Sequence, residues 1–245
     1  MEIYAHPAMQ VLTKADSSPL TQADLASDRV IGQGLSELAL APVLSEESAA
    51  TAYARRCNWP RFWLVDPLDG TKEFVKRNGE FTVNIALVEN GEPVLGVVYA
   101  PVLDVCYFAA RGAGAFVKRG GVVQKIHVRE CMPGEPIRVV ASRSHSDARN
   151  SALLDELGEH QCISMGSSLK LCLVAEGMAH LYPRLGLTME WDTAAAHAIV
   201  KEAGGRVCDL HGAELVYNKA DLHNPEFFVL SAQDQALFEK IQDAV

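Results

Sequence analysis

The sequence lacks any run of basic residues and any long uninterrupted apolar segment. Its 22 lysines and arginines are outnumbered by 31 aspartates and glutamates, which gives a formal net charge of -9. Proteins that bind nucleic acid polymers usually present a basic face, so a polymer partner is not expected. The most apolar stretch, residues 94–110, contains Pro101 and Asp104. It falls short of the ~18 unbroken residues of a spanning helix, so no transmembrane segment is expected.

The six cysteines are scattered, and no two of them form a CxxC pair. In a chain of this length, such spacing is typical of reduced thiols in a reducing compartment. The N-terminus has no basic segment followed by an apolar one, so no secretory signal is expected. These absences predict a cytoplasmic protein, and leave open a weak association with the cytoplasmic side of the inner membrane.

What the sequence does contain is enough apolar material for a core: 49% of its 245 residues are hydrophobic. The pattern of the first half predicts a helix from Thr21 and then strands at residues 62–65, 81–88, 94–99 and 105–108, followed by two more on either side of Gly120-Gly121, the second at 122–128. The second half alternates, with strands at 137–141, 162–165, 179–182 and 227–230 and helices at 147–157, 168–176, 193–203 and 233–244. This order indicates an α/β (α+β) fold with helices layered on sheets. Turn formers at 132–134 suggest a division into residues 1–131 and 132–245.

The most informative segment is Asp66-Pro67-Leu68-Asp69-Gly70-Thr71, at the end of an apolar strand. Proline restricts the backbone there, and glycine permits a tight turn, so that both carboxylates can point to one spot. Hard oxygen ligands of this kind suit Mg²⁺. A plain polar turn is the alternative. The spacing differs from the DxDGT motif of phosphatases that form an aspartyl phosphate, so a covalent intermediate is not expected.

Other acidic residues have ordinary interpretations when each is taken alone. Glu46 and Glu47 could be solvated surface, and Asp24 could favour the helix dipole near Thr21. Asp192 would serve as the N-cap of the helix from residue 193. His197 on that helix is expected to be a packed or surface histidine, because no second histidine or cysteine stands beside it at ligand spacing.

Together these segments resemble the inositol monophosphatase superfamily of metal-dependent phosphatases. The family pattern has an SEE-like loop, then DPxDGT, then WDxAAxxxIxxEAGG, and the chain has all three in that order at residues 45–47, 66–71 and 191–205. A finer resemblance is to bacterial 3'(2'),5'-bisphosphate nucleotidases, at residues 66–74, 77–86, 142–145, 166–170 and 182–184. Inositol monophosphatases typically have Asn-Phe after DGT, where this chain has Lys72-Glu73-Phe74.

The resemblance implies a layered αβαβα sandwich of the inositol monophosphatase and fructose-1,6-bisphosphatase type. Two or three Mg²⁺ ions would be held by Glu46, Asp66, the carbonyl of Leu68, Asp69 and Asp192. Water would be activated with the help of Asp24, Glu46 and Thr71. The residues implied to contact substrate are Glu46, Leu68, Asp69, Gly70, Thr71, His145, Ser167, Lys170, Arg184 and Asp192.

The activity implied is Mg²⁺-dependent hydrolysis of 3'-phosphoadenosine 5'-phosphate, a small nucleotide bisphosphate, to AMP and phosphate. This would clear a by-product of sulfate assimilation, and sensitivity to Li⁺ would be expected. Two alternatives stay open: a sugar phosphatase like inositol monophosphatase, and a non-catalytic phosphate-binding protein on the same fold. Homodimer formation also stays open.

Overall fold

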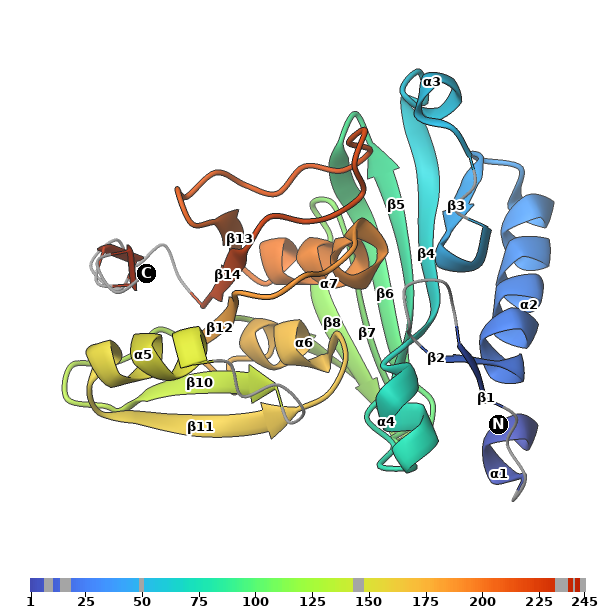
Figure 1. Cartoon of the computed structure of the whole chain (residues 1–245). Helices are drawn as coiled ribbons and strands as arrows, with labels where there is room; N and C mark the ends of the chain where they lie inside the picture. The colour runs from blue at the N-terminus through green and yellow to red at the C-terminus, as the bar shows by residue number, and fades with distance from the viewer. Residues whose placement is uncertain are drawn as a thin grey trace.

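Helices and the two larger β-sheets lie in five layers, in the order helix, sheet, helix, sheet, helix, in the computed structural model of the chain (Figure 1), and β1 and β2 form a separate two-stranded sheet. It describes residues 1–6, 11–13, 19–48, 51–142, 148–231, 238–239 and 241–242. The described elements are α1 (Glu2–Ala5), β1 (Val11–Thr13), β2 (Pro19–Thr21), α2 (Gln22–Leu38), β3 (Val43–Ser45), the 3-10 turn η1 (Glu46–Ser48), α3 (Tyr53–Arg56), β4 (Arg61–Asp69), α4 (Thr71–Lys76), β5 (Thr82–Glu89), β6 (Glu92–Ala100), β7 (Val105–Ala110), β8 (Gly114–Arg119), β9 (Val122–Ile126), β10 (Ile137–Ser142), α5 (Ala148–Leu157), β11 (His160–Met165), α6 (Leu169–Ala175), β12 (Leu181–Arg184), α7 (Glu190–Glu202), β13 (Arg206–Asp209) and β14 (Phe227–Leu230).

The larger sheet has seven strands in the order β3-β4-β5-β6-β7-β8-β9. Its strands alternate buried and half-buried residues, which is the pattern of a sheet with one face in a core. Helix α2 covers one face, where Leu35 packs against Trp63 and Val65. Helix α7 covers the other face and approaches closely at Gly96, where a Cβ would lie 2.0 Å from the carbonyl oxygen of Ala195. Only glycine permits this approach.

The smaller sheet has five strands in the order β11-β10-β12-β14-β13. Helices α6 and α7 lie between the two sheets, and α5 lies on the outer face of the smaller one (Figure 1). There Leu153 and Leu157 pack against Val139 and Leu181. The expected layered α/β fold is therefore confirmed. The strands of the larger sheet lie within residues 43–126, and those of the smaller sheet lie within residues 137–230. The division into two subdomains at residue 131 stays a prediction.

Several predicted boundaries differ from the observed ones, and the short strands β1, β2 and β3 were not predicted. The strand predicted to end at Val65 continues to Asp69, because Pro67 falls where the strand pairing is irregular and no N–H is required. The helix predicted from Thr193 begins at Glu190, so Asp192 is in its first turn and is not the N-cap. Strand β13 was not predicted. The last predicted helix, 233–244, lies largely outside the described residues.

Further expectations concern histidine, cysteine and the membrane. His197 is buried, as expected for a packed histidine. All six cysteines are free. In the part of the chain that the structure describes, no helix has the length and apolar character needed to cross a bilayer.

Candidate metal and phosphate site

A β-bulge in β4 brings Asp66 and Asp69 to the same face of the sheet. Three residues apart in a regular strand, the two side chains would point to opposite faces. Here Asp66 pairs with Asn84 and Asp69 pairs with Thr82, so β4 advances three residues where β5 advances two. The extra residue changes the face of the sheet to which the following side chains point, which is common for bulges near active sites. Both carboxylates therefore share a face with Thr82 and Asn84.

Four carboxylates from three parts of the chain act on one another at this place. Asp66 is buried, and its burial, followed by the charges of Glu46, Asp69 and Asp192, raises its pKa well above the usual value. Loss of hydration in the surrounding protein, followed by the charge of Asp69, raises the pKa of Asp192 to about 8. Like charges held together in a poorly solvated place repel one another, and a bound cation relieves this repulsion. The donor set is therefore that of a site for a hard divalent ion.

The loop before α6 touches the end of β4 directly. The N–H of Ser168 donates to Oδ2 of Asp69 at 2.6 Å. A Cβ on Gly70 would lie 3.3 Å from Cβ of Ser167, and Gly70 has a positive φ of 88° that favours glycine. A Cβ on Gly166 would lie 2.7 Å from a carbonyl oxygen, so this position also requires glycine. The close approach places residues 166–168 against the acidic cluster.

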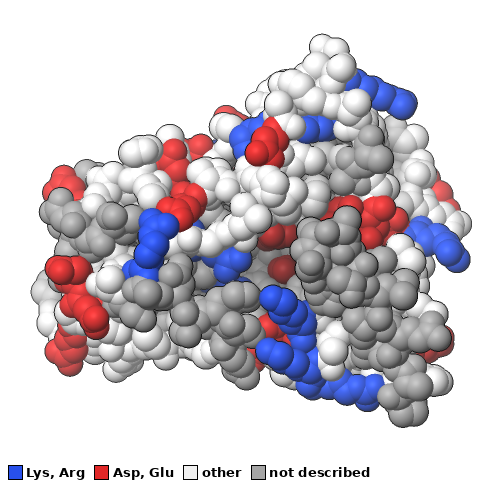
Figure 2. Space-filling model, viewed as in Figure 1, with Lys and Arg blue, Asp and Glu red and all other residues white. Residues whose placement is uncertain are grey.

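A small pocket of about 70 Å³ joins the acidic residues to basic ones, and its lining includes Asp69, Ser167, Lys170, Arg184 and Asp192. Lys170 is 8% exposed, and its Nζ donates to the carbonyl oxygen of Ser167 at 2.7 Å. The charge of Arg184 lowers the pKa of Asp192, and Nη2 of Arg184 donates to the carbonyl oxygen of Leu187 at 2.9 Å. Figure 2 shows acidic atoms recessed near the middle of this face, with Lys and Arg side chains on two sides of them.

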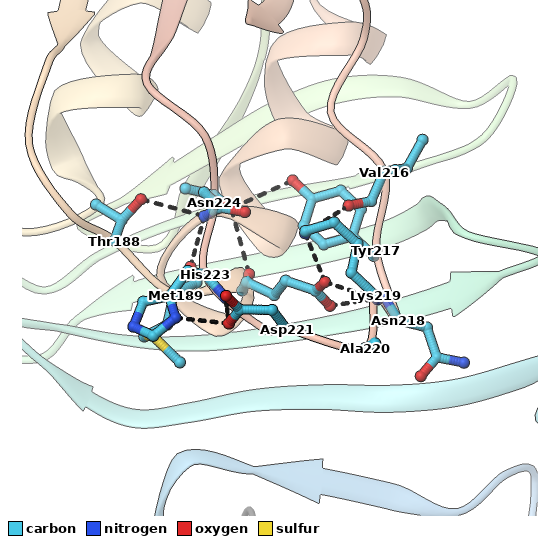
Figure 3. A network of polar contacts seen from close by, with 12 residues as sticks. Thr188, Met189, Val216, Tyr217, Asn218, Lys219, Ala220, Asp221, His223 and Asn224 are labelled. Atoms are coloured by element: carbon cyan, nitrogen blue, oxygen red, sulfur yellow. Dashed lines mark hydrogen bonds and ion pairs between the residues drawn. The ribbon is translucent and has the colours of Figure 1, made fainter. Parts of the chain in front are cut away.

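The start of α7, which carries Asp192, is held by a network of polar contacts with the loop at residues 215–224 (Figure 3). Glu190 is fully buried and accepts from the N–H of Asn218 at 2.6 Å and from Nζ of Lys219 at 2.6 Å. The side chain of Asn224 donates to the carbonyl oxygen of Met189 at 2.7 Å. Asp192 itself accepts from the N–H of Met189 at 2.8 Å. These contacts fix the position of the first turn.

Asp24 and Thr71 are not brought together by any hydrogen bond in the described residues. Asp24 is buried in the first turn of α2, where its Oδ2 accepts from the N–H and the hydroxyl of Thr21 at 2.8 and 2.6 Å. This is a capping box, a structural role in its own right. Thr71 is the first residue of α4, directly after Gly70. His145, predicted to contact substrate, lies outside the described residues.

A second group of metal-ligating side chains has no suitable chemistry for a metal. Cys131, Glu135 and His180 offer ligand atoms within 4.8 Å of one another, the one such group of three in the described residues. The backbone N–H of Arg138 donates to Nδ1 of His180 at 3.1 Å, so the lone pair of Nδ1 is already engaged. The Arg138 guanidinium lies 3.0 Å from Nε2, and Arg129 forms an ion pair with Glu135. Within the residues that the structure describes, no three carboxylates of the acidic cluster offer oxygens that all lie within 4.8 Å of one another.

Three residues of the site were not identified from the sequence: Thr82, Asn84 and Ser168. Asn84 is fully buried and donates to Oγ of Ser168 at 2.9 Å. The signal that could have found Thr82 and Asn84 is the alternation of β5, which puts these polar residues on the same buried face as Ala86 and Val88. Buried polar side chains usually have polar partners. Ser168 had no comparable signal.

Comparison with known proteins finds the same family that the sequence motifs resemble, over nearly the whole chain. Residues 2–245 match the sequence profile of the Inositol monophosphatase family. The chain is 54% identical over 232 residues to the 3'(2'),5'-bisphosphate nucleotidase CysQ of Escherichia coli strain K12, covering 94% of this chain and 92% of that protein. It is 55% identical over 233 residues to the CysQ of Salmonella typhimurium strain LT2, with the same coverage.

Solved structures agree with this. The crystal structure of CysQ from Bacteroides thetaiotaomicron has a TM-score of 0.85 at 44% identity and covers 95% of this chain and 92% of that one. An IMPase from Thermotoga maritima has a TM-score of 0.81 at 27% identity and covers 99% and 90%. The chain belongs to the inositol monophosphatase family. Phosphatases of this family depend on metal ions, and the buried Asp66 with the half-buried Glu46, Asp69 and Asp192 fit such ions.

Proposed function

We propose that the chain is a Mg²⁺-dependent phosphatase that hydrolyses 3'-phosphoadenosine 5'-phosphate to AMP and phosphate. The observation that carries this is one pocket whose lining includes both Asp69 and Asp192, two of the proposed metal ligands, and the basic residues Lys170 and Arg184. A phosphate can approach a group of carboxylates only with cations between them. The basic side of the pocket supplies charge for a second phosphate. The relatives at 54–55% identity are named for this class of substrate.

The proposed metal ligands are Glu46, Asp66, the carbonyl oxygen of Leu68, Asp69 and Asp192. Carboxylate and carbonyl oxygens are the ligands that Mg²⁺ prefers, whereas softer metals favour thiolate or imidazole. Bound divalent ions would neutralise the phosphate and lower the pKa of water. Li⁺ should inhibit by replacing one Mg²⁺, as the family resemblance suggests.

The chain's own groups would bind the phosphate and direct water to it. Gly70 and Thr71 are proposed to hold the phosphate that is cleaved, at the start of α4. Glu46, Asp24 and Thr71 would orient the water and relay the proton that it releases. The water oxygen bonds to phosphorus, the bond from phosphorus to the ribose 3' oxygen breaks, and the relayed proton goes to that oxygen. No covalent enzyme intermediate forms.

The second phosphate would be bound by Ser167, Lys170 and Arg184, with His145 as a further predicted contact. Binding energy at a phosphate that does not react can be used to orient the phosphate that does. A substrate without the second phosphate would leave Lys170 and Arg184 unpaired. We therefore expect discrimination against inositol phosphates. The proposed setting is sulfate assimilation in the cytoplasm.

The test compares phosphate release from three substrates by the wild-type protein and by Arg184→Gln. We expect kcat/KM to be highest for 3'-phosphoadenosine 5'-phosphate, lower for adenosine 3'-phosphate and lowest for inositol 1-phosphate. Arg184→Gln should lower kcat/KM for the bisphosphate and change it little for adenosine 3'-phosphate. Faster turnover of inositol 1-phosphate would reverse the substrate assignment. Absence of metal-dependent release from all three would favour a phosphate-binding protein.

A further inference from the structure

We propose that Ser168 is a positioning residue of the metal site, which fixes the Asp69 carboxylate and ties it to the main chain of Asp192. The inference rests on the proposed function, because it concerns the same metal site. Ser168 lies at the start of α6 and contacts both Asp69 of β4 and Asp192 of α7, which are proposed ligands. It is 2% exposed, so its polar groups are satisfied by the protein.

The first step of the argument is the orientation of Asp69. Ser168 contacts Oδ2 of this carboxylate twice, through its N–H at 2.6 Å and its Oγ at 2.9 Å. The side chains of Thr82 and Asn84 add weaker contacts to the same oxygen at 3.4 Å. All four contacts fall on Oδ2, so a cation would use Oδ1. The carboxylate is thus held in one orientation, in which Oδ2 accepts hydrogen bonds and Oδ1 is left for a cation.

The second step is the link to α7. Oγ of Ser168 also lies 2.6 Å from the carbonyl oxygen of Asp192. A hydroxyl has one hydrogen, so it is shared between this carbonyl and the Asp69 carboxylate. Nδ2 of Asn84 donates to the same Oγ at 2.9 Å and restricts the direction in which the hydroxyl hydrogen can point. One serine therefore joins β4, α6 and α7 at the acidic cluster.

The third step is the consequence for metal binding. Carboxylates that repel one another bind an ion well only if their oxygens are already oriented toward it. Groups that hydrogen-bond to metal ligands typically change metal affinity by about 10–100-fold when they are removed. Loss of the Ser168 hydroxyl would leave the N–H contact to Asp69 but break the connection to Asp192. We expect weaker metal binding without loss of the fold.

The experiment is calorimetric titration of the metal-free protein with Mn²⁺, combined with thermal unfolding in chelator. The variants are Ser168→Ala, which removes the hydroxyl, and Ser168→Cys, which keeps a similar shape but is a poor hydrogen-bond donor. The matched control is Tyr107→Phe, which removes a hydroxyl that donates to the carboxylate of Glu176 at the other end of α6. Asp69→Asn serves as the reference for loss of a metal ligand.

The expected result is a dissociation constant for Mn²⁺ about 10–100-fold higher in both Ser168 variants, with an unfolding midpoint in chelator close to wild type. Tyr107→Phe should bind Mn²⁺ like wild type. Ser168 variants within twofold of wild type would overturn the role of Ser168 and leave the proposed function intact. A wild-type protein that does not bind Mn²⁺, or Asp69→Asn binding it equally well, would overturn both.

Discussion

Asp66 is buried beside three other carboxylates, and this combination determines how its proton behaves. Its pKa in the folded protein is raised, by burial first and then by Glu46, Asp69 and Asp192. A carboxyl group whose folded pKa exceeds its unfolded value stabilises the fold below the unfolded pKa, and this stability is lost as the pH rises through the folded pKa. Because Asp192 titrates at about 8, the metal-free protein should lose this stability as the pH rises from about 4 to about 8.

The substitution Asp66→Asn should separate activity from stability. We expect phosphate release to fall to the background rate, because a metal ligand is lost. The unfolding midpoint of the metal-free protein at pH 8 should rise, by about 2–4 °C for each kcal/mol of repulsion relieved. Phosphate assays and thermal unfolding in chelator measure the two effects.

Glu47→Gln is the control for that substitution, because Glu47 lies beside Glu46 in the same turn and has no assigned role in the site. It should leave turnover near wild type. Near-normal activity of purified Asp66→Asn would count against the assignment of the metal site.

At the level of elements, the first turn of α7 contains an ion pair between the fully buried Glu190 and the half-buried Lys219. Removing one partner of a buried pair leaves a charge without compensation and typically costs 3–5 kcal/mol. Glu190 keeps two backbone N–H donors, from Asn218 and Lys219. We therefore expect Lys219→Met to cost about 3 kcal/mol, the low end of that range. This corresponds to a fall of about 6–12 °C in the unfolding midpoint.

The comparison for Lys219→Met is Lys201→Met, which removes the exposed pair of Lys201 and Glu214, with side chains 42% and 47% exposed. Exposed pairs contribute less than about 1 kcal/mol. Denaturant unfolding of both variants gives the two free energies. Equal losses in the two variants would show that the pair with Glu190 does not stabilise the start of α7.

The pH dependence of stability should carry a contribution from His197, in the middle of α7. Burial lowers its pKa, although a hydrogen bond to Glu214 opposes this. Because the folded pKa lies below the unfolded value of about 6.5, the unfolded state binds more protons in this range. Stability present above about pH 6.5 is therefore lost as the pH falls. The groups that face His197 are Tyr217, Glu214, Lys201 and Glu92.

A titration of the unfolding free energy between pH 7.5 and pH 5 tests this for wild type and His197→Gln. The difference between the two proteins cancels the contributions of other groups, including His180, whose pKa is also lowered by burial. We expect the variant to lose less stability as the pH falls. Parallel curves would mean that His197 does not titrate differently in the folded and unfolded states.

At the scale of the whole molecule, most helices and strands could be predicted from the sequence because each carries its own periodicity, whereas the order of the layers followed only from the family resemblance. The strand order and the bulge in β4 could not be predicted, because spacing alone does not reveal an extra residue in one strand of a pair. The proposed metal ligands were identified by residue type within three short motifs. Ser168 could not be identified, since its partner Asp69 is 99 residues away and no local pattern connects them.

The measurement that tests the account most directly is phosphate release from 3'-phosphoadenosine 5'-phosphate after removal of metal ions. The protein is treated with chelator, and Mg²⁺ is then added back in steps to wild type and to Asp66→Asn. We expect no release without metal, recovery in wild type with a saturable dependence on Mg²⁺, and no recovery in the variant. Undiminished release in chelator would contradict the central claim that these carboxylates act by binding divalent ions.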